Sequence, residues 1–121
     1  MCLVSYLPLS DGFIISSNRD ETPLRSDTKL TKESINDTTI LFPKDQKGGS
    51  WIIVSKDGRA ICVLNGAFKK HKRKHNYRMS RGLMMKHYFE YNSTTSFLQD
   101  FDFSDIEAFT CLLYTSDAAD D

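Results

Sequence analysis

The chain has 121 residues, of which 40% are hydrophobic and 26% are charged, as in a single globular domain or a part of one. Lys and Arg together number 16, as do Asp and Glu, so no overall electric field favours nucleic acid, a membrane surface or an acidic substrate as a partner. No apolar run approaches the ~20 residues of a membrane span, and the start of the chain lacks the segments of a secretory signal, which predicts a cytoplasmic protein.

The first predicted elements are two short apolar strands, 3–7 and 13–17, joined by a turn that contains Asp11-Gly12. An Asp-Gly pair between two such runs indicates a β-hairpin. The segment 18–46 is polar and interrupted by prolines, so we expect mostly loop there, with one short strand at 40–42.

A second, more apolar hairpin is predicted from strands 50–55 and 60–65, which flank the turn Asp57-Gly58. One antiparallel sheet could hold both hairpins.

The segment 77–91 has apolar residues near helical spacing, with Ser80 in position to cap the helix. The side of this helix that carries Leu83 and Met84 should pack against the sheet. A further short helix near 97–98 and the start of another strand at 106–110 follow.

The tail 111–121 differs in kind from the rest of the chain. As a whole it resembles the translation of a transposase adapter used in preparing sequencing libraries. We therefore predict that residues 1–110 are the amino-terminal part of a longer domain, and that 111–121 is adapter read-through to be excluded from the fold. The alternative is that Cys111 begins the next native strand.

Cys2, Cys62 and Cys111 form an odd set without a CxxC pair, which favours reduced thiols over a disulfide framework or a zinc site. Cys2 has distinct chemistry, because aminopeptidase removal of Met1 would leave its thiol beside a free α-amine with a pKa of about 7.7–8.0. That amine can take the thiol proton, so one residue would supply both nucleophile and base. The alternative is a buried, inert cysteine.

The polar segment Asn18-Arg19-Asp20-Glu21 directly follows the second predicted strand. Pairing of the first two strands brings the end of the second beside the start of the first, close to Cys2. Arg19 could then lower the pKa of the thiol and hold a substrate carbonyl or carboxylate, while Asp20 could orient the α-ammonium. The alternative is a solvated ionic loop, or an ion pair that only staples the hairpin.

Asn65 ends the second hairpin, where its amide could donate to an oxyanion, although Asn65-Gly66 is also a common turn pair. The run 69–75 is strongly basic, but in a neutral chain we expect a solvated loop rather than a site for nucleic acid. His71 and His75 lack neighbouring acids or cysteines, so no metal site is predicted.

Six short segments, in order along the chain, together resemble the NRDE family, which is named for its tetrapeptide and is related to the transport and Golgi organisation family of eukaryotes. Each segment alone is a weak motif, but six in family order leave little room for coincidence. They are Met1-Cys2, Ser17-Asn18-Arg19-Asp20-Glu21, Gly48-Gly49-Ser50-Trp51-Ile52, Asp57-Gly58-Arg59-Ala60, Leu64-Asn65-Gly66 and Met79-Ser80-Arg81-Gly82.

The resemblance implies an α+β fold of the N-terminal nucleophile hydrolase kind, a four-layer αββα sandwich of which this chain would form only the N-terminal part. The later strands, which would bring a second oxyanion asparagine and another arginine, would be missing, so the fragment alone is expected to be inactive. It also implies a cysteine amidohydrolase that acts on carbon–nitrogen amide bonds, like the amidases that cleave penicillin V and bile-salt conjugates. The catalytic residues carried over are Cys2, Arg19, Asp20 and Asn65. Those amidases order their Arg and acidic residues differently, so Glu21 could take the acidic role.

We assign substrate contacts to Asn18, Glu21 and Trp51, and predict that the reaction needs no cofactor and no metal. The expected partner is a small-molecule amide, with no nucleic acid and no membrane involved. A rival interpretation is a non-catalytic carrier whose pocket holds haem or another apolar ligand, and a third is a structural domain with an inert Cys2. The sequence leaves the oligomeric state open.

Overall fold

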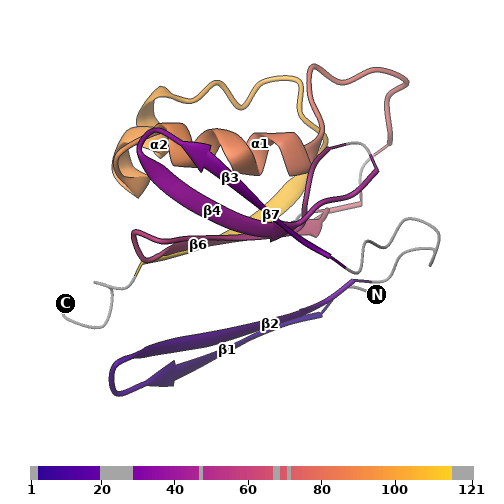
Figure 1. Ribbon diagram of the computed structural model, residues 1–121. Coiled ribbons are helices and arrows are strands. Elements are labelled where there is room, and N and C mark those ends of the chain that lie inside the picture. The colour runs from indigo at the N-terminus through magenta and orange to yellow at the C-terminus, as the bar shows by residue number, and fades with distance from the viewer. Residues whose placement is uncertain (1–2, 20–28, 47, 67–68, 71, 116–121) are drawn as a thin grey trace.

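Helices, a five-stranded antiparallel sheet and a separate two-stranded hairpin stack as three layers (Figure 1). The computed structural model describes residues 3–19, 29–46, 48–66, 69–70 and 72–115. Its elements, in chain order, are β1 (Leu3–Leu9), β2 (Gly12–Asn18), β3 (Leu30–Ile35), β4 (Thr38–Pro43), β5 (Ile52–Ser55), β6 (Arg59–Asn65), α1 (Arg81–His87), η2 (Tyr88–Glu90), α2 (Thr94–Asp100) and β7 (Phe109–Thr115). The predicted α+β class is confirmed, whereas the N-terminal nucleophile kind, with its second helical layer, stays a prediction.

The first predicted hairpin is confirmed. β1 and β2 pair antiparallel, with Leu3 opposite Asn18 and Leu9 opposite Gly12. This register brings the residue after β2, Arg19, to the same end of the hairpin as the start of β1.

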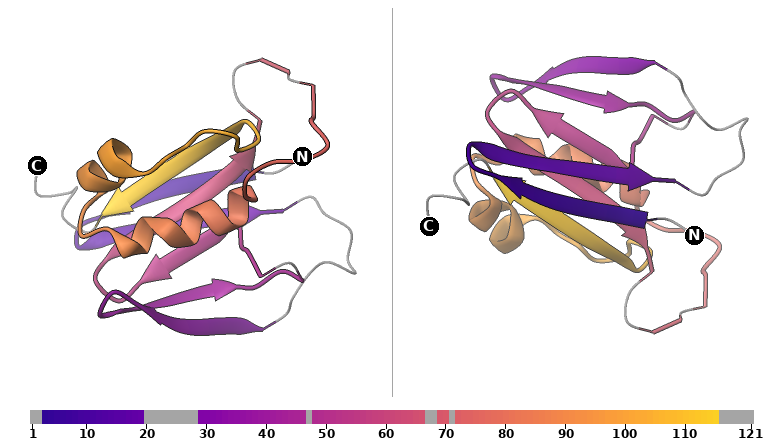
Figure 2. Two further views of the ribbon diagram at one scale, coloured as in Figure 1. Left: turned by 90° about the horizontal axis from the view of Figure 1, so that it is seen from above. Right: turned by 90° about the horizontal axis from the view of Figure 1, so that it is seen from below.

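The suggestion that both hairpins share one sheet is wrong. β5 and β6 belong to a sheet with the order β3-β4-β5-β6-β7, and the hairpin β1–β2 forms a sheet of its own. The two edges of β6 are occupied by β5 and β7, so the first hairpin has no edge of β6 to join. It stacks face to face on the larger sheet, on the side opposite the helices (Figure 2).

The polar segment before residue 46 also holds more structure than predicted. β3 and β4 form a hairpin around Asn36 and Asp37, which have positive φ values of 49° and 65°. Two consecutive residues in this region suit the tight turns that match strand twist. The strand β3 was missed because its alternating residues are mostly polar and carry little apolar signal.

β6 lies between β5 and β7 and is buried on both faces from Arg59 to Val63. Ile61 and Val63 belong to the core under the helices, while Cys62 faces the hairpin and donates from its thiol to the Ser17 hydroxyl at 3.8 Å. On the same side, Tyr6 of β1 stacks on Tyr114 of β7 with ring centroids 4.8 Å apart. A strand covered on two sides needs a continuous apolar run rather than an alternating one.

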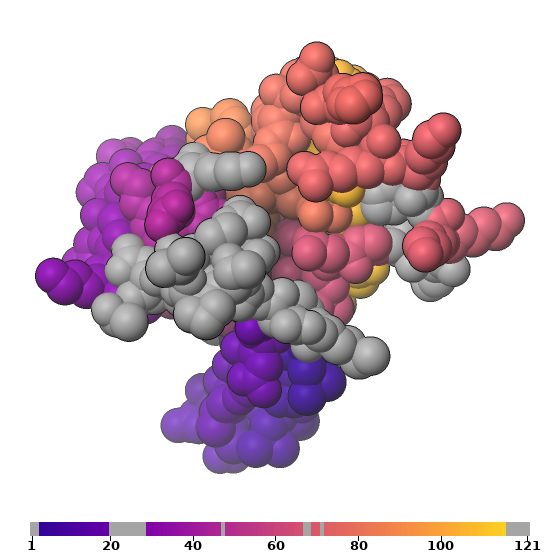
Figure 3. All heavy atoms as spheres, turned by 90° about the vertical axis from the view of Figure 1, so that its right-hand side faces the viewer, coloured from indigo at the N-terminus to yellow at the C-terminus, as the bar shows by residue number. Residues whose placement is uncertain are grey.

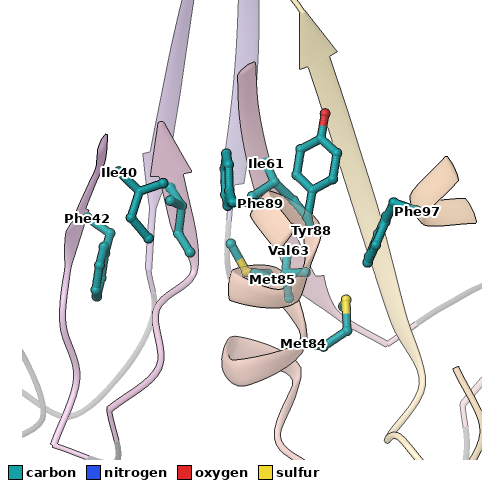
Figure 4. Packing of buried hydrophobic residues seen from close by; sticks show 10 residues of the cluster. Ile40, Phe42, Ile61, Val63, Met84, Met85, Tyr88, Phe89 and Phe97 are labelled. Carbon is teal, nitrogen blue, oxygen red and sulfur yellow. The ribbon is translucent and has the colours of Figure 1, made fainter. Parts of the chain in front are cut away.

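The main core lies between the helices and the five-stranded sheet (Figure 4). Met84 and Met85 of α1 and Tyr88 and Phe89 of η2 are all fully buried there. Leu83, which we expected to pack against the sheet with Met84, is 37% exposed, because the other four residues already form the inward stripe of this short helix. In the described ranges, no helix has the length and apolar character that a membrane crossing requires.

The start of α1 is fixed by a cap and by a close backbone contact. Ser80 is the N-cap, as predicted, and its hydroxyl accepts a hydrogen bond from the Leu83 amide at 3.1 Å. A Cβ atom added at Gly82 would lie 2.7 Å from the Ser50 carbonyl oxygen and 2.8 Å from the Ser50 nitrogen. Only glycine allows the helix to lie this close to the loop that leads into Trp51.

The far end of the same helical segment is held by Arg59, which is only 8% exposed. Its guanidinium forms an ion pair with Asp57 at 2.8 Å and donates to the Tyr91 carbonyl at 2.7 Å. Burial alone would raise the pKa of Asp57, but hydrogen bonds from Arg59 and Ser55 and the charge of Arg59 outweigh it and hold this pKa below its ordinary value.

β7 crosses the boundary that we predicted at residue 110. Its pairing with β6 continues without interruption from Phe109 opposite Asn65 to Thr115 opposite Arg59. Leu112, Leu113 and Tyr114 have high intrinsic β-propensity or apolar character, so pairing suits either origin of the tail. The boundary and the foreign origin of the tail stay predictions.

Replacing Gly82 by Ala should destabilise the fold by about 2 kcal/mol, because overpacking against fixed backbone exceeds the gain of about 1 kcal/mol in helix propensity. Gly12→Ala is the matched control, since no atom lies within 4 Å of a Cβ added there. Urea unfolding should show a loss for Gly82→Ala and a change within about 0.5 kcal/mol for Gly12→Ala. Equal effects would contradict the close contact.

Asp57→Asn should change the acid sensitivity of the fold. Because the pKa of Asp57 lies below 3.8 in the folded chain, its contribution to stability is present above that pH and is lost as pH falls through the folded pKa. Thermal melting points should therefore fall less steeply on acidification in Asp57→Asn than in the parent chain. Asp37→Asn, at an exposed position that makes no ion pair within the described residues, should keep the parental slope.

Candidate functional site

A cavity of about 640 Å³ opens at the end of the molecule where β2 and β6 finish and α1 begins. Its volume is that of a small-molecule site. Figure 3 looks onto this end, where the segment leading into α1 lies above the end of β6. The lining is mostly polar and consists of Ser17, Arg19, Asp45, Ser50, Trp51, Val63, Asn65, Arg73, His75, Asn76, Tyr77, Met79, Ser80, Arg81, Gly82 and Glu107.

Arg19, directly after β2, forms one wall. Its guanidinium lies 4.4 Å from the centroid of the Trp51 ring and 3.9 Å from the Asp45 carboxylate. Asp45 is itself held in a turn, because its side chain accepts from the Gly49 amide at 3.1 Å. An arginine stacked on an aromatic face and paired with a fixed carboxylate keeps its charge in one place.

Asn65 closes β6 at the same cavity. It lies opposite Phe109 of β7, and the Gly66 that follows has a φ of 85° and donates its amide to the Ala108 carbonyl at 3.1 Å. The chain therefore turns away immediately after Asn65, and the exposed carboxamide remains at the strand end. Such an amide is a suitable donor to a developing oxyanion.

A second ion pair also lines the cavity. Arg81, the first residue of α1, lies 3.3 Å from the Glu107 carboxylate and donates to the Ala108 carbonyl at 3.0 Å. Sequence reasoning did not assign either residue to the site. Arg81 lay within one of the six motif segments, whereas nothing in the sequence near Glu107 pointed to a partner on α1.

Three of the residues assigned from the sequence, Arg19, Trp51 and Asn65, are brought together in this cavity. Asn18 is exposed and is not among the lining residues. Cys2, Asp20 and Glu21 lie outside the described residues, so their assigned roles stay predictions.

The two cysteines that the structure describes are poor nucleophiles. Cys62 is fully buried, and burial, together with the nearby Cys62, raises the pKa of Cys111 to about 12. Cys62 is paired with Leu112 and Cys111 with Val63, so the two thiols point to opposite faces of the sheet. Cys111 therefore stays protonated near neutral pH and Cys62 is shielded from solvent.

In the described part of the chain, no group of three His, Cys, Asp or Glu residues is arranged to hold a metal ion. His75 lines the cavity, while His71 lies outside the described residues.

Comparison with known proteins gives one match. The family described as Transport and Golgi organisation 2 matches residues 1–118, a range that includes β7. Neither the curated proteins nor the solved structures contain a match to this chain.

Proposed function

The chain belongs to the Transport and Golgi organisation 2 family, and on that basis we propose that it is a hydrolase of carbon–nitrogen amide bonds with the Cys2 thiol as its nucleophile. The observation that carries the proposal is the convergence of Arg19, Trp51 and Asn65 on one cavity. These residues come from three separate segments of the chain. The sequence predicts catalytic roles for Arg19 and Asn65 and a substrate contact for Trp51. The proposed enzyme is thus a hydrolase of the N-terminal nucleophile type.

The register of the first hairpin supports the role of Cys2. Cys2 adjoins Leu3, whose partner is Asn18, and Asn18 is followed by Arg19 at the cavity. In the proposed reaction the positive charge of Arg19 favours the thiolate, although Asp45 at 3.9 Å offsets part of that charge. Met1 must first be removed, so that the α-amine of Cys2 becomes free.

The reaction then proceeds in two stages. The α-amine takes the thiol proton, the sulfur attacks the amide carbonyl, and Asn65 donates to the oxyanion. The carbon–nitrogen bond breaks as the α-ammonium passes its proton to the leaving amine, which gives a thioester on Cys2. Water, deprotonated by the same amine, cleaves the thioester and releases the acid. Asp20 or Glu21 would orient the ammonium.

A carrier of haem or another apolar ligand is the rival function. It would need a largely apolar pocket, whereas Arg19, Asp45, Arg81 and Glu107 place two ion pairs in the wall of this one. Charged groups left without water beside an apolar ligand carry a desolvation cost. The lining therefore favours a polar substrate over an apolar cargo.

We also propose a cytoplasmic location. The two described thiols point to opposite faces of the sheet and cannot pair with each other, which suits a reducing compartment.

Mass spectrometry of the full-length protein after removal of Met1, incubated with a panel of nitroanilides, tests the proposal directly. We expect an acyl adduct on Cys2, and release of nitroaniline that falls about a thousandfold or more in Cys2→Ala. A chain that retains Met1 should be equally inactive, because the base is then lost. Cys62→Ala is the matched control and should react like the parent, because the Cys62 thiol is fully buried and does not line the cavity. Absence of any adduct across the panel, together with tight haem binding, would favour the carrier.

A further inference from the structure

Among the described residues that line the cavity, cationic side chains outnumber carboxylates. The two carboxylates in this set, Asp45 and Glu107, each face an arginine, Arg19 at 3.9 Å and Arg81 at 3.3 Å. These four residues therefore sum to zero charge. Arg73 also lines the cavity, and it makes no ion pair within the part of the chain that the structure describes.

His75 lines the cavity beside Arg73, and both are exposed. The rest of the same segment is basic as well, with exposed lysines at 69, 70, 72 and 74, of which Lys74 is paired with Asp105 at 3.3 Å. The chain as a whole has no net charge, so this positive field is local to the cavity mouth. A concave, positively charged site attracts and orients anions.

The segment that carries these two residues is anchored between them, at Lys74, and after His75, at Tyr77 and Arg78, unlike a loop that is only solvated. The Tyr77 hydroxyl accepts from the Lys74 amide at 3.0 Å. The Arg78 amide donates to the Asp105 carbonyl at 2.8 Å, and its guanidinium donates to the Ser104 carbonyl at 3.1 Å. Anchoring of this kind lowers the entropy that Arg73 and His75 would lose on binding a ligand.

We propose that Arg73 and His75 form an anion subsite at the cavity mouth, and that it binds a carboxylate on the substrate. The planar guanidinium of Arg73 matches a carboxylate in bidentate geometry, and an imidazole N–H of His75 supplies a further donor. The predicted substrate is thus an amide that also carries a carboxylate. That identity rests on the proposed hydrolase function, whereas the anion subsite itself does not.

Two probes that differ in one group test the subsite. They are a nitroanilide with a carboxylate on its leaving ring and the same compound with a primary carboxamide in that place. The full-length parent protein, without Met1, should turn over the carboxylate probe with a kcat/KM about three to ten times higher than the carboxamide probe, as expected for one partly exposed charge-assisted contact. Raising the salt concentration should reduce this preference.

The variants Arg73→Gln and His75→Gln should lose the preference, with the larger loss in Arg73→Gln. Lys72→Gln is the matched control, because it removes the same charge from the same segment at a residue that does not line the cavity. It should keep the parental ratio. Equal turnover of the two probes by the parent, or an equal loss of preference in Lys72→Gln, would overturn the subsite.

Binding measurements separate this inference from the hydrolase proposal. Calorimetry with Cys2→Ala and the free aminonitrobenzoate, which is the leaving group of the carboxylate probe, needs no catalysis. Binding that weakens about three- to tenfold with Arg73→Gln, but not with Lys72→Gln, supports the subsite even if no probe acylates Cys2. Binding that is unaffected by Arg73→Gln, or absent, refutes the subsite even if acylation occurs.

Discussion

The contact between Gly82 and the backbone of Ser50 determines how the helical layer meets the sheet, and the cavity depends on it. Because a Cβ at Gly82 would lie 2.7 Å from the Ser50 carbonyl oxygen, the start of α1 rests on the loop that leads into Trp51. Arg81 and Trp51 are therefore brought to the same cavity from segments far apart in the sequence. At the other end, Arg59 binds the Tyr91 carbonyl at 2.7 Å, so the helical segment is held at both ends.

The stacking of the hairpin on the larger sheet supplies the remaining wall. Tyr6 against Tyr114 and Ser17 against Cys62 hold the two sheets face to face, which aligns the end of β2 with the end of β6. Arg19 then reaches Trp51 and Asp45 across the gap between layers. The family's characteristic segments thus meet in space through two kinds of contact. Pairing along the sheet joins Trp51 to β6, where the Val63 amide donates to the Trp51 carbonyl at 3.0 Å, and packing between the layers adds Arg19 and Arg81.

Local signals in the sequence predicted the elements that depend on local chemistry. The turn at Asp11-Gly12 and the cap at Ser80 are of this kind, because a few neighbouring residues determine each of them. The stacking of the hairpin could not be predicted, since it depends on β7 occupying the second edge of β6. The ion pair Arg81–Glu107 could not be predicted either, because its two residues are far apart in the sequence and meet only in the folded chain. Arg19 and Asn65 were predicted from their places at strand ends and were supported by the resemblance, while Cys2 lies outside the described residues.

The central claim is that this cavity is the place where Cys2 meets its substrate. A crystal structure of the Met1-processed chain, trapped as an acyl adduct by a slowly hydrolysed nitroanilide, tests it most directly. The account predicts a thioester on the Cys2 sulfur, with its carbonyl oxygen about 3 Å from the Asn65 amide nitrogen and the acyl chain within the cavity beside Trp51. An adduct that lies outside the cavity, or on a different side chain, would contradict it.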